Sequence, residues 1–208
     1  MSKRKQLGNK YLKRKGPVRR PNKLILIVCE GAKTEPTYFN AIRREKRISS
    51  AIIKIVPGNI SGPHPKNVVT FAKEEEKVGD YDEVWCVFDR DEHEDIATAI
   101  DVAKRSGLYI AYSNPSFELW FLYHFQSQTA HIERDDLITT LKRYIPDYDK
   151  SMNVYDIISQ YETRAIEQAE RVRKWHCDNF DPEIKNPSTS VDKLLRCLRS
   201  IELIPNRR

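Results

Sequence analysis

The sequence predicts an α/β fold, in which a parallel sheet with helices on both faces is followed by a C-terminal, all-helical addition. Short apolar runs alternate with segments of helical periodicity between residues 23 and 125, and this alternation is typical of parallel sheets with crossover helices. After residue 126 only helical periodicity is left. We therefore expect an α/β core over 24–126 and a helical extension over 127–208 that packs on the core.

Four short segments are predicted to be strands because they are apolar and rich in β-branched residues. They cover residues 23–29, 51–56, 83–88 and 108–112. The first, KLILIVC, has an unbroken apolar run, as expected of a strand that is buried on both faces. The segment 57–65 contains two glycines and three prolines, so it is predicted to be a loop.

Helical periodicity follows each of these strands. The predicted helices of the core cover residues 35–47, 66–78, 94–106 and 116–125. Thr34 and Ser116 are expected to cap the first and the last of them. Gly107 is expected to end the third, because glycine is favoured just after the last turn of a helix.

The extension is predicted to contain three helices, over residues 134–144, 154–177 and 190–202. The last has an apolar stripe, and Thr189 with Asp192 makes a capping-box pattern at its start. No internal repeat is visible in the sequence.

Charge is distributed unevenly along the chain. Residues 1–23 contain ten lysines and arginines and no acidic residue, and the rest of the chain carries a net charge of −4 because the whole carries +6. Such a segment cannot bury enough apolar surface to fold alone. We expect a flexible basic arm, which either neutralises nucleic-acid phosphates or serves only to keep the protein in solution.

The remaining composition favours a cytoplasmic protein. No stretch approaches the ~18 apolar residues of a membrane span, and no apolar stretch precedes a cleavage-like site near residue 1, so we expect no signal peptide. The four cysteines form no C-x-x-C pair, and Cys29 and Cys86 lie inside apolar runs. Buried, reduced thiols are the simplest interpretation.

Acidic residues follow two of the predicted strands directly. Glu30 follows the first, in IVCEG, and Asp89 and Asp91 follow the third, in VFDRDE. Because ligands of parallel sheets lie at the carboxyl ends of the strands, we expect these acids to meet at one edge. Carboxylates so close together repel one another unless a cation lies between them. All-oxygen ligands favour Mg²⁺ or Mn²⁺, which support phosphoryl chemistry.

Several neighbouring residues have two possible roles. Lys33 and Arg90 either bind a substrate phosphate or form salt bridges with the acids, and Asn114 either turns the chain or contacts a ligand. Glu118 lies in the apolar sequence SFELWF, where a carboxylate needs a partner or a cation. It is either part of the active site or an acid at a helix N-terminus.

Four motifs in this order resemble the RloB family of bacterial proteins: VCEGAKTEPTYF, FDRDEH, NPSFELWFLYHF and NPSTSVDKLL. The resemblance spans about residues 24–200, and the acids at the strand ends are similar to those of the Toprim fold. It implies that Glu30 is a general acid/base or a metal ligand and that Asp89 and Asp91 bind metal. It also implies, more loosely, that Glu35 and Glu118 bind a second ion.

The same resemblance implies a link to restriction and phage-defence systems, in which related Toprim proteins are nucleases and some of them act on tRNA. The leading hypothesis is a nuclease that uses Mg²⁺ or Mn²⁺ to hydrolyse phosphodiester bonds of RNA, possibly tRNA, or of DNA. The alternative is a non-catalytic subunit or sensor that binds nucleic acid or a protein partner of a defence system.

Overall fold

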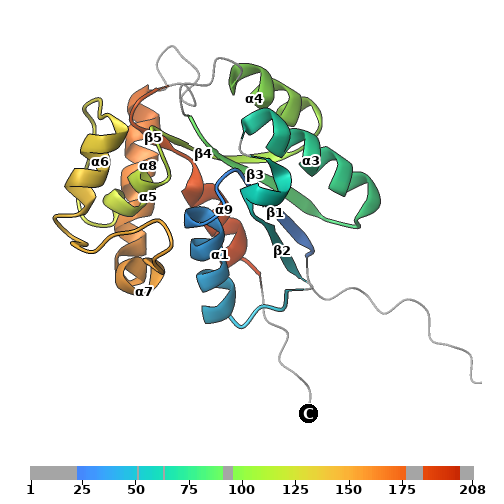
Figure 1. Ribbon diagram of the computed structural model, residues 1–208, viewed down its shortest axis with the longest axis horizontal. Helices are drawn as coiled ribbons and strands as arrows, with labels where there is room; N and C mark the ends of the chain where they lie inside the picture. The colour runs from blue at the N-terminus through green and yellow to red at the C-terminus, as the bar shows by residue number, and fades with distance from the viewer. Residues whose placement is uncertain (1–22, 51, 63, 91–95, 177–184, 202–208) are drawn as a thin grey trace, which may run out of the picture.

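The computed structural model describes residues 23–50, 52–62, 64–90, 96–176 and 185–201 (Figure 1). Within them the sheet has the strand order β2-β1-β3-β4-β5. The strands are β1 (Ile25–Cys29), β2 (Ile53–Val56), β3 (Glu83–Asp89), β4 (Tyr109–Asn114) and β5 (Ser188–Thr189). The pairs among β1 to β4 are parallel, which confirms the predicted α/β class.

One strand departs from the expected all-parallel sheet. β5 pairs antiparallel with the end of β4, so that Ser113 lies opposite Thr189 and Asn114 opposite Ser188. This pairing extends β4 two residues beyond its predicted end at residue 112. The sequence did not indicate β5, because two polar residues carry no strand periodicity.

Helices cover both faces of the sheet, as predicted. α3 (Pro65–Val78) and α4 (Ile96–Arg105) pack on the face that carries Leu26 and Cys86. α1 (Thr34–Glu45) and α9 (Val191–Arg199) pack on the opposite face (Figure 1). Gly107 follows α4 with a φ of 75°, in the left-handed region where glycine is favoured, so its predicted role as a helix end is confirmed.

Two of the predicted helix starts in the core are wrong. Thr34 is the first residue of α1 rather than its cap, and its hydroxyl donates to the carbonyl oxygen of Lys150 at 3.3 Å. α5 covers Glu118–Tyr123, and its N-cap is Phe117 instead of Ser116. A short helix, α2 (Gly58–Ser61), also lies in the segment predicted to be a loop. Residues 94 and 95, predicted as the start of the third helix, lie outside the described residues.

The extension contains α6 (Arg134–Leu141), α7 (Tyr155–Ile158), the 3₁₀ turn η1 (Ser159–Tyr161) and α8 (Glu162–His176). The single helix predicted over 154–177 is therefore interrupted. Arg199 of α9 bridges the two sides of the interruption: it donates to the Tyr155 hydroxyl at 2.9 Å and to Glu162 Oε1 at 3.0 Å. This tertiary contact, which periodicity cannot reveal, accompanies the break.

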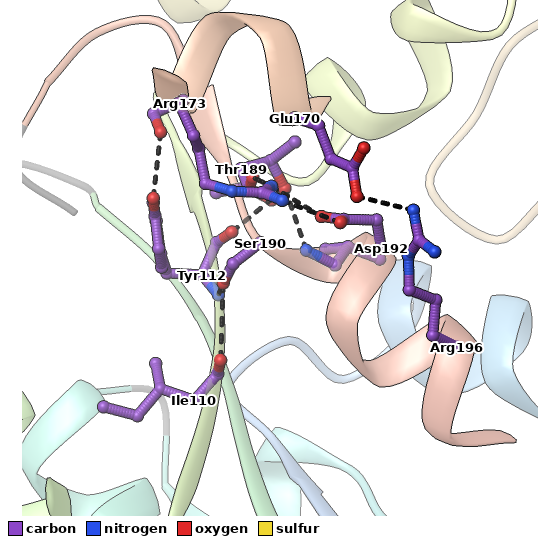
Figure 2. Close-up of polar contacts among 11 residues, drawn as sticks. Ile110, Tyr112, Glu170, Arg173, Thr189, Ser190, Asp192 and Arg196 are labelled. Carbon is purple, nitrogen blue, oxygen red and sulfur yellow. Dashed lines mark hydrogen bonds and ion pairs between the residues drawn. The ribbon is translucent and has the colours of Figure 1, made fainter. Parts of the chain in front are cut away.

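A buried polar network holds β5 and α9 against the sheet (Figure 2). Arg173 of α8 donates to both carboxylate oxygens of Asp192, at 2.6 and 2.7 Å, and the two side chains are only 11% and 1% exposed. The predicted capping box is wrong, because the N-cap of α9 is Ser190 instead of Thr189 and the Asp192 carboxylate binds Arg173. The Ser190 hydroxyl accepts from the Tyr112 amide at 3.0 Å and donates to the Ile110 carbonyl oxygen at 3.3 Å.

The last part of the chain therefore contributes a strand to the sheet and a helix to one of its faces. The division of the chain at residue 126 stays a prediction. Cys29 and Cys86 are buried free thiols, as expected. Among the described residues, no helix is long and apolar enough to cross a membrane.

Candidate active site

A cavity of about 850 Å³ lies at the carboxyl ends of β1 and β3. Asp149 of the extension lines it, and so do four further acidic residues: Glu30, Glu35, Asp89 and Glu118. They come from four elements that are distant in sequence, namely the ends of β1 and β3 and the first turns of α1 and α5. The structure thus brings together all the acids that the sequence singled out except Asp91, which lies outside the described residues.

Glu30 and Asp89 are tied to each other through the backbone. The Asp89 amide donates to Glu30 Oε2 at 3.0 Å, and the Glu30 amide donates to the Val87 carbonyl oxygen at 2.8 Å. The second bond continues the parallel pairing of β1 with β3 by one residue. The first acid therefore has a fixed position relative to the second.

Gly31 makes room for the carboxylate of Glu35. Its amide donates to Glu35 Oε1 at 3.1 Å, and a Cβ at position 31 would lie 2.0 Å from Glu35 Oε2. The helix α2 holds the other side of this turn, because the Gly58 amide donates to the Gly31 carbonyl oxygen at 3.0 Å and the Ser61 hydroxyl to that of Cys29 at 2.8 Å. Sequence reasoning missed this role of α2. In the sequence, the glycines and prolines of segment 57–65 indicated only a loop, and nothing else pointed to a helix that supports Gly31.

Glu118 is almost completely buried, with 2% of its surface exposed. Its Oε2 accepts from the Ser116 hydroxyl at 2.6 Å, and its Oε1 accepts from the Tyr148 hydroxyl at 2.7 Å. A buried carboxylate needs such donors, because the charged form is otherwise costly away from water. Ser116 therefore serves this acid, and Tyr148 of the extension was not predicted to take part.

Arg134, the first residue of α6, brings a positive charge to the cavity. Its Nη2 lies 3.2 Å from Asp89 Oδ2, and the two side chains are 33% and 13% exposed. Lys33 and Lys150 also line the cavity. Lys33 was anticipated from the sequence, whereas Arg134 and Lys150 lie far from the acidic motifs and carried no signal of their own.

Burial and mutual repulsion favour the protonated form of two of these acids. Burial, with contributions from Glu118 and Glu30, raises the pKa of Glu35 to about 7. Burial also raises the pKa of Asp89 well above its usual range, with Glu35 and Glu118 adding to the effect and the Arg134 guanidinium opposing it. The carboxylates around Asp89 therefore repel one another more than the partly exposed guanidinium of Arg134 compensates.

The two other residues expected to bind substrate lie elsewhere. Neither Arg90 nor Asn114 lines the cavity. The amide of Arg90 donates to the Ser113 carbonyl oxygen at 2.7 Å, and Asn114 is buried next to β5, where a cis peptide bond joins it to Pro115. Asn114 is the last residue of β4, so the chain leaves the strand after this position and does not turn at it. Substrate contacts by Arg90 and Asn114 stay predictions.

The side chains of these acids are chemically suitable ligands for a hard divalent cation, because all their donor atoms are carboxylate oxygens. A bound cation would also relieve the repulsion that helps to raise the pKa values of Glu35 and Asp89. Within the described part of the chain, however, no three Asp, Glu, His or Cys side chains are arranged to hold an ion as they stand. Asp89 is instead paired with Arg134. Binding would thus require side chains to turn, and Asp91 stays a candidate ligand from the sequence.

The protein is therefore an α/β protein with a mostly parallel sheet, and its acidic side chains gather at the carboxyl ends of two strands. The chain belongs to the RloB family: the sequence model described as RloB-like protein matches residues 25–198. Neither the comparison with curated proteins nor that with solved structures gave a match. Membership of the Toprim superfamily stays a prediction from the motifs.

Proposed function

We propose that this protein is a nuclease that hydrolyses phosphodiester bonds with the help of Mg²⁺ or Mn²⁺. The observation that carries the proposal is the cavity in which four carboxylates meet at the strand ends beside three cationic side chains. Acids that raise one another's pKa suit a divalent cation, and lysines and an arginine suit the phosphates of a polyanionic substrate.

Each carboxylate has a role that follows from its position. Asp89 and Glu30, joined at the ends of β1 and β3, would hold the ion together with Asp91. Glu35, held against Gly31, is suited to a second ion or to accepting a proton, since its pKa lies near neutrality. Glu118, held by hydrogen bonds from two hydroxyl groups, would add a further negative charge beside the ion. A bound ion would polarise the phosphate and lower the pKa of an attacking water.

The substrate is proposed to be nucleic acid, RNA or DNA, with tRNA among the candidates. Lys33 and Lys150 lie exposed where a backbone would enter the cavity. The basic segment 1–23 would add affinity that falls with salt, as phosphate contacts do. A role in phage defence is the biological setting that the family resemblance suggests.

A cleavage assay tests the proposal. Purified full-length protein is incubated with tRNA, single-stranded RNA and plasmid DNA in Mg²⁺, Mn²⁺ or EDTA. We expect cleavage of at least one substrate that EDTA abolishes and that Glu30→Gln and Asp89→Asn each reduce by about 100-fold or more. Glu170→Gln is the control, because this exposed carboxylate pairs with Arg196 and does not line the cavity.

Cleavage that survives in both active-site variants would overturn the assignment. If no substrate is cleaved but one is bound without metal, the non-catalytic binding subunit becomes the better hypothesis. Binding is measured with the same nucleic acids in EDTA, so that the two functions are separated in one series.

A further inference from the structure

The ion pair between Asp89 and Arg134 joins the two regions of the chain across the cavity. Asp89 ends a strand of the sheet, whereas Arg134 begins a helix of the extension, and their side chains are 3.2 Å apart. The carboxylate is largely buried and the guanidinium is one-third exposed. Arg134 can therefore reach toward solvent, while Asp89 cannot leave the cavity.

The guanidinium supplies the counter-charge that Asp89 needs in the structure as described. It opposes the rise in the pKa of Asp89 that burial and the neighbouring acids cause. A divalent cation bound by Asp89 would supply the same counter-charge, so the arginine and the ion compete for one carboxylate. An arginine displaced in this way still needs an anion, and its planar fork matches a phosphate.

We propose that Arg134 is an exchangeable counter-ion: it neutralises Asp89 in the unloaded cavity and turns to a phosphate of the nucleic acid when the ion site is filled. The inference rests on the proposed function and adds a positioning residue to it. Binding of the ion and binding of the substrate are then coupled, because Arg134 must release Asp89 before it can bind a phosphate of the nucleic acid.

The surroundings of Arg134 agree with a phosphate at this place. Lys33 and Lys150 line the same cavity, and the Thr34 hydroxyl anchors the Lys150 backbone to the start of α1 at 3.3 Å. The three cations come from both regions of the chain. A phosphate held among them would lie between the sheet and the extension.

The proposal predicts effects of opposite sign for one substitution. Arg134→Ala removes the competitor of the ion, so the dissociation constant for Mn²⁺ should fall by about fivefold or more. The same change removes a phosphate contact, so affinity for nucleic acid in Mn²⁺ should fall by about fivefold or more. Arg134→Lys keeps the charge without the fork and should lie between wild type and alanine in both measurements.

The experiment uses the full chain. Calorimetry measures Mn²⁺ binding without nucleic acid, and fluorescence anisotropy measures binding of a labelled single-stranded RNA in Mn²⁺ and in EDTA. Arg196→Ala is the matched control, since it also removes an arginine that pairs with a glutamate, on the surface and outside the cavity. Thermal unfolding of each variant verifies that it is folded.

The two hypotheses fail in different ways. If wild type binds no Mn²⁺ with or without RNA, the proposed metal-dependent function is overturned and this inference with it. If wild type binds Mn²⁺ but Arg134→Ala binds it equally or more weakly, only the inference is overturned. Tighter Mn²⁺ binding with unchanged RNA affinity would also overturn it, because Arg134 would then be a partner of Asp89 alone.

Discussion

The hydroxyl of Tyr148 donates a 2.7 Å hydrogen bond to Oε1 of Glu118, which is 2% exposed. In the sequence, Glu118 precedes α6 and Tyr148 follows it, thirty positions later. This bond, together with that from Ser116 to the other oxygen, satisfies a carboxylate that has almost no contact with water. The loop after α6 is therefore part of the cavity wall.

Tyr148→Phe should destabilise the protein by about 1.5–3 kcal/mol, because hydrogen bonds to charged groups contribute in this range. Tyr144→Phe is the matched control: its hydroxyl donates to Gln126 in an exposed position, and we expect a change below about 0.5 kcal/mol. Urea denaturation measures both free energies of unfolding. Equal costs for the two variants would show that burial of the Glu118 carboxylate is not what makes the Tyr148 bond important.

Gly58→Ala should disrupt the turn that positions Glu30. A Cβ at residue 58 would lie 1.6 Å from the carbonyl oxygen of Glu30, which belongs to the backbone and cannot move aside alone. We expect a loss of stability of about 1–3 kcal/mol or more, the range typical of overpacking, together with loss of cleavage.

Gly107→Ala separates this steric effect from the general cost of replacing glycine. Its φ is 75° but nothing lies within 4 Å of the added carbon, so we expect about 1 kcal/mol and intact cleavage. Chemical denaturation and the cleavage assay check both variants. Wild-type activity in Gly58→Ala would contradict the role assigned to α2.

The pKa of Glu35 predicts a specific dependence of stability on pH. Burial raises it from 4.5 to about 7, so between these values the folded protein keeps a proton that the unfolded chain releases. Stability from this group is undiminished below pH 4.5 and is lost as pH rises through 7. The shift corresponds to a loss of roughly 3 kcal/mol.

Urea denaturation between pH 4.5 and 8 checks this, with wild type compared to Glu35→Gln, which cannot titrate. We expect wild type to lose stability relative to the variant over this range. Mn²⁺ should restore more stability to wild type at pH 8 than at pH 6, because the ion prefers the ionised acid. Parallel curves without metal would refute the raised pKa.

Asp192→Ala should be among the most damaging changes outside the cavity. It leaves the Arg173 guanidinium buried without its carboxylate, and breaking such a pair costs about 3–5 kcal/mol. Glu170→Ala breaks the exposed pair with Arg196 and should cost at most about 1 kcal/mol. The midpoints of urea denaturation distinguish the two, and a small effect of Asp192→Ala would mean that water or another group replaces the lost partner.

Much of the fold could be predicted because hydrophobic periodicity is a local property. The apolar run ILIVC indicated β1, and EVWCVF indicated β3, since strands buried on both faces leave such a pattern. Their parallel order then placed Glu30 beside Asp89. By contrast, β5 and the interruption before α8 depend on contacts with Tyr112 and Arg199, which lie far away in the sequence.

The amino-acid sequence alone predicted the α/β class, the resemblance to the RloB family and the set of acids at the strand ends. It did so because strand periodicity and residue type can be read position by position. The three-dimensional structure was needed to show that Arg134 and Lys150 line the same cavity, that Tyr148 donates to Glu118, and that Arg90 does not line the cavity. Charge and hydrogen-bond partners of a buried acid depend on distance in space, and no pattern along the chain records that distance.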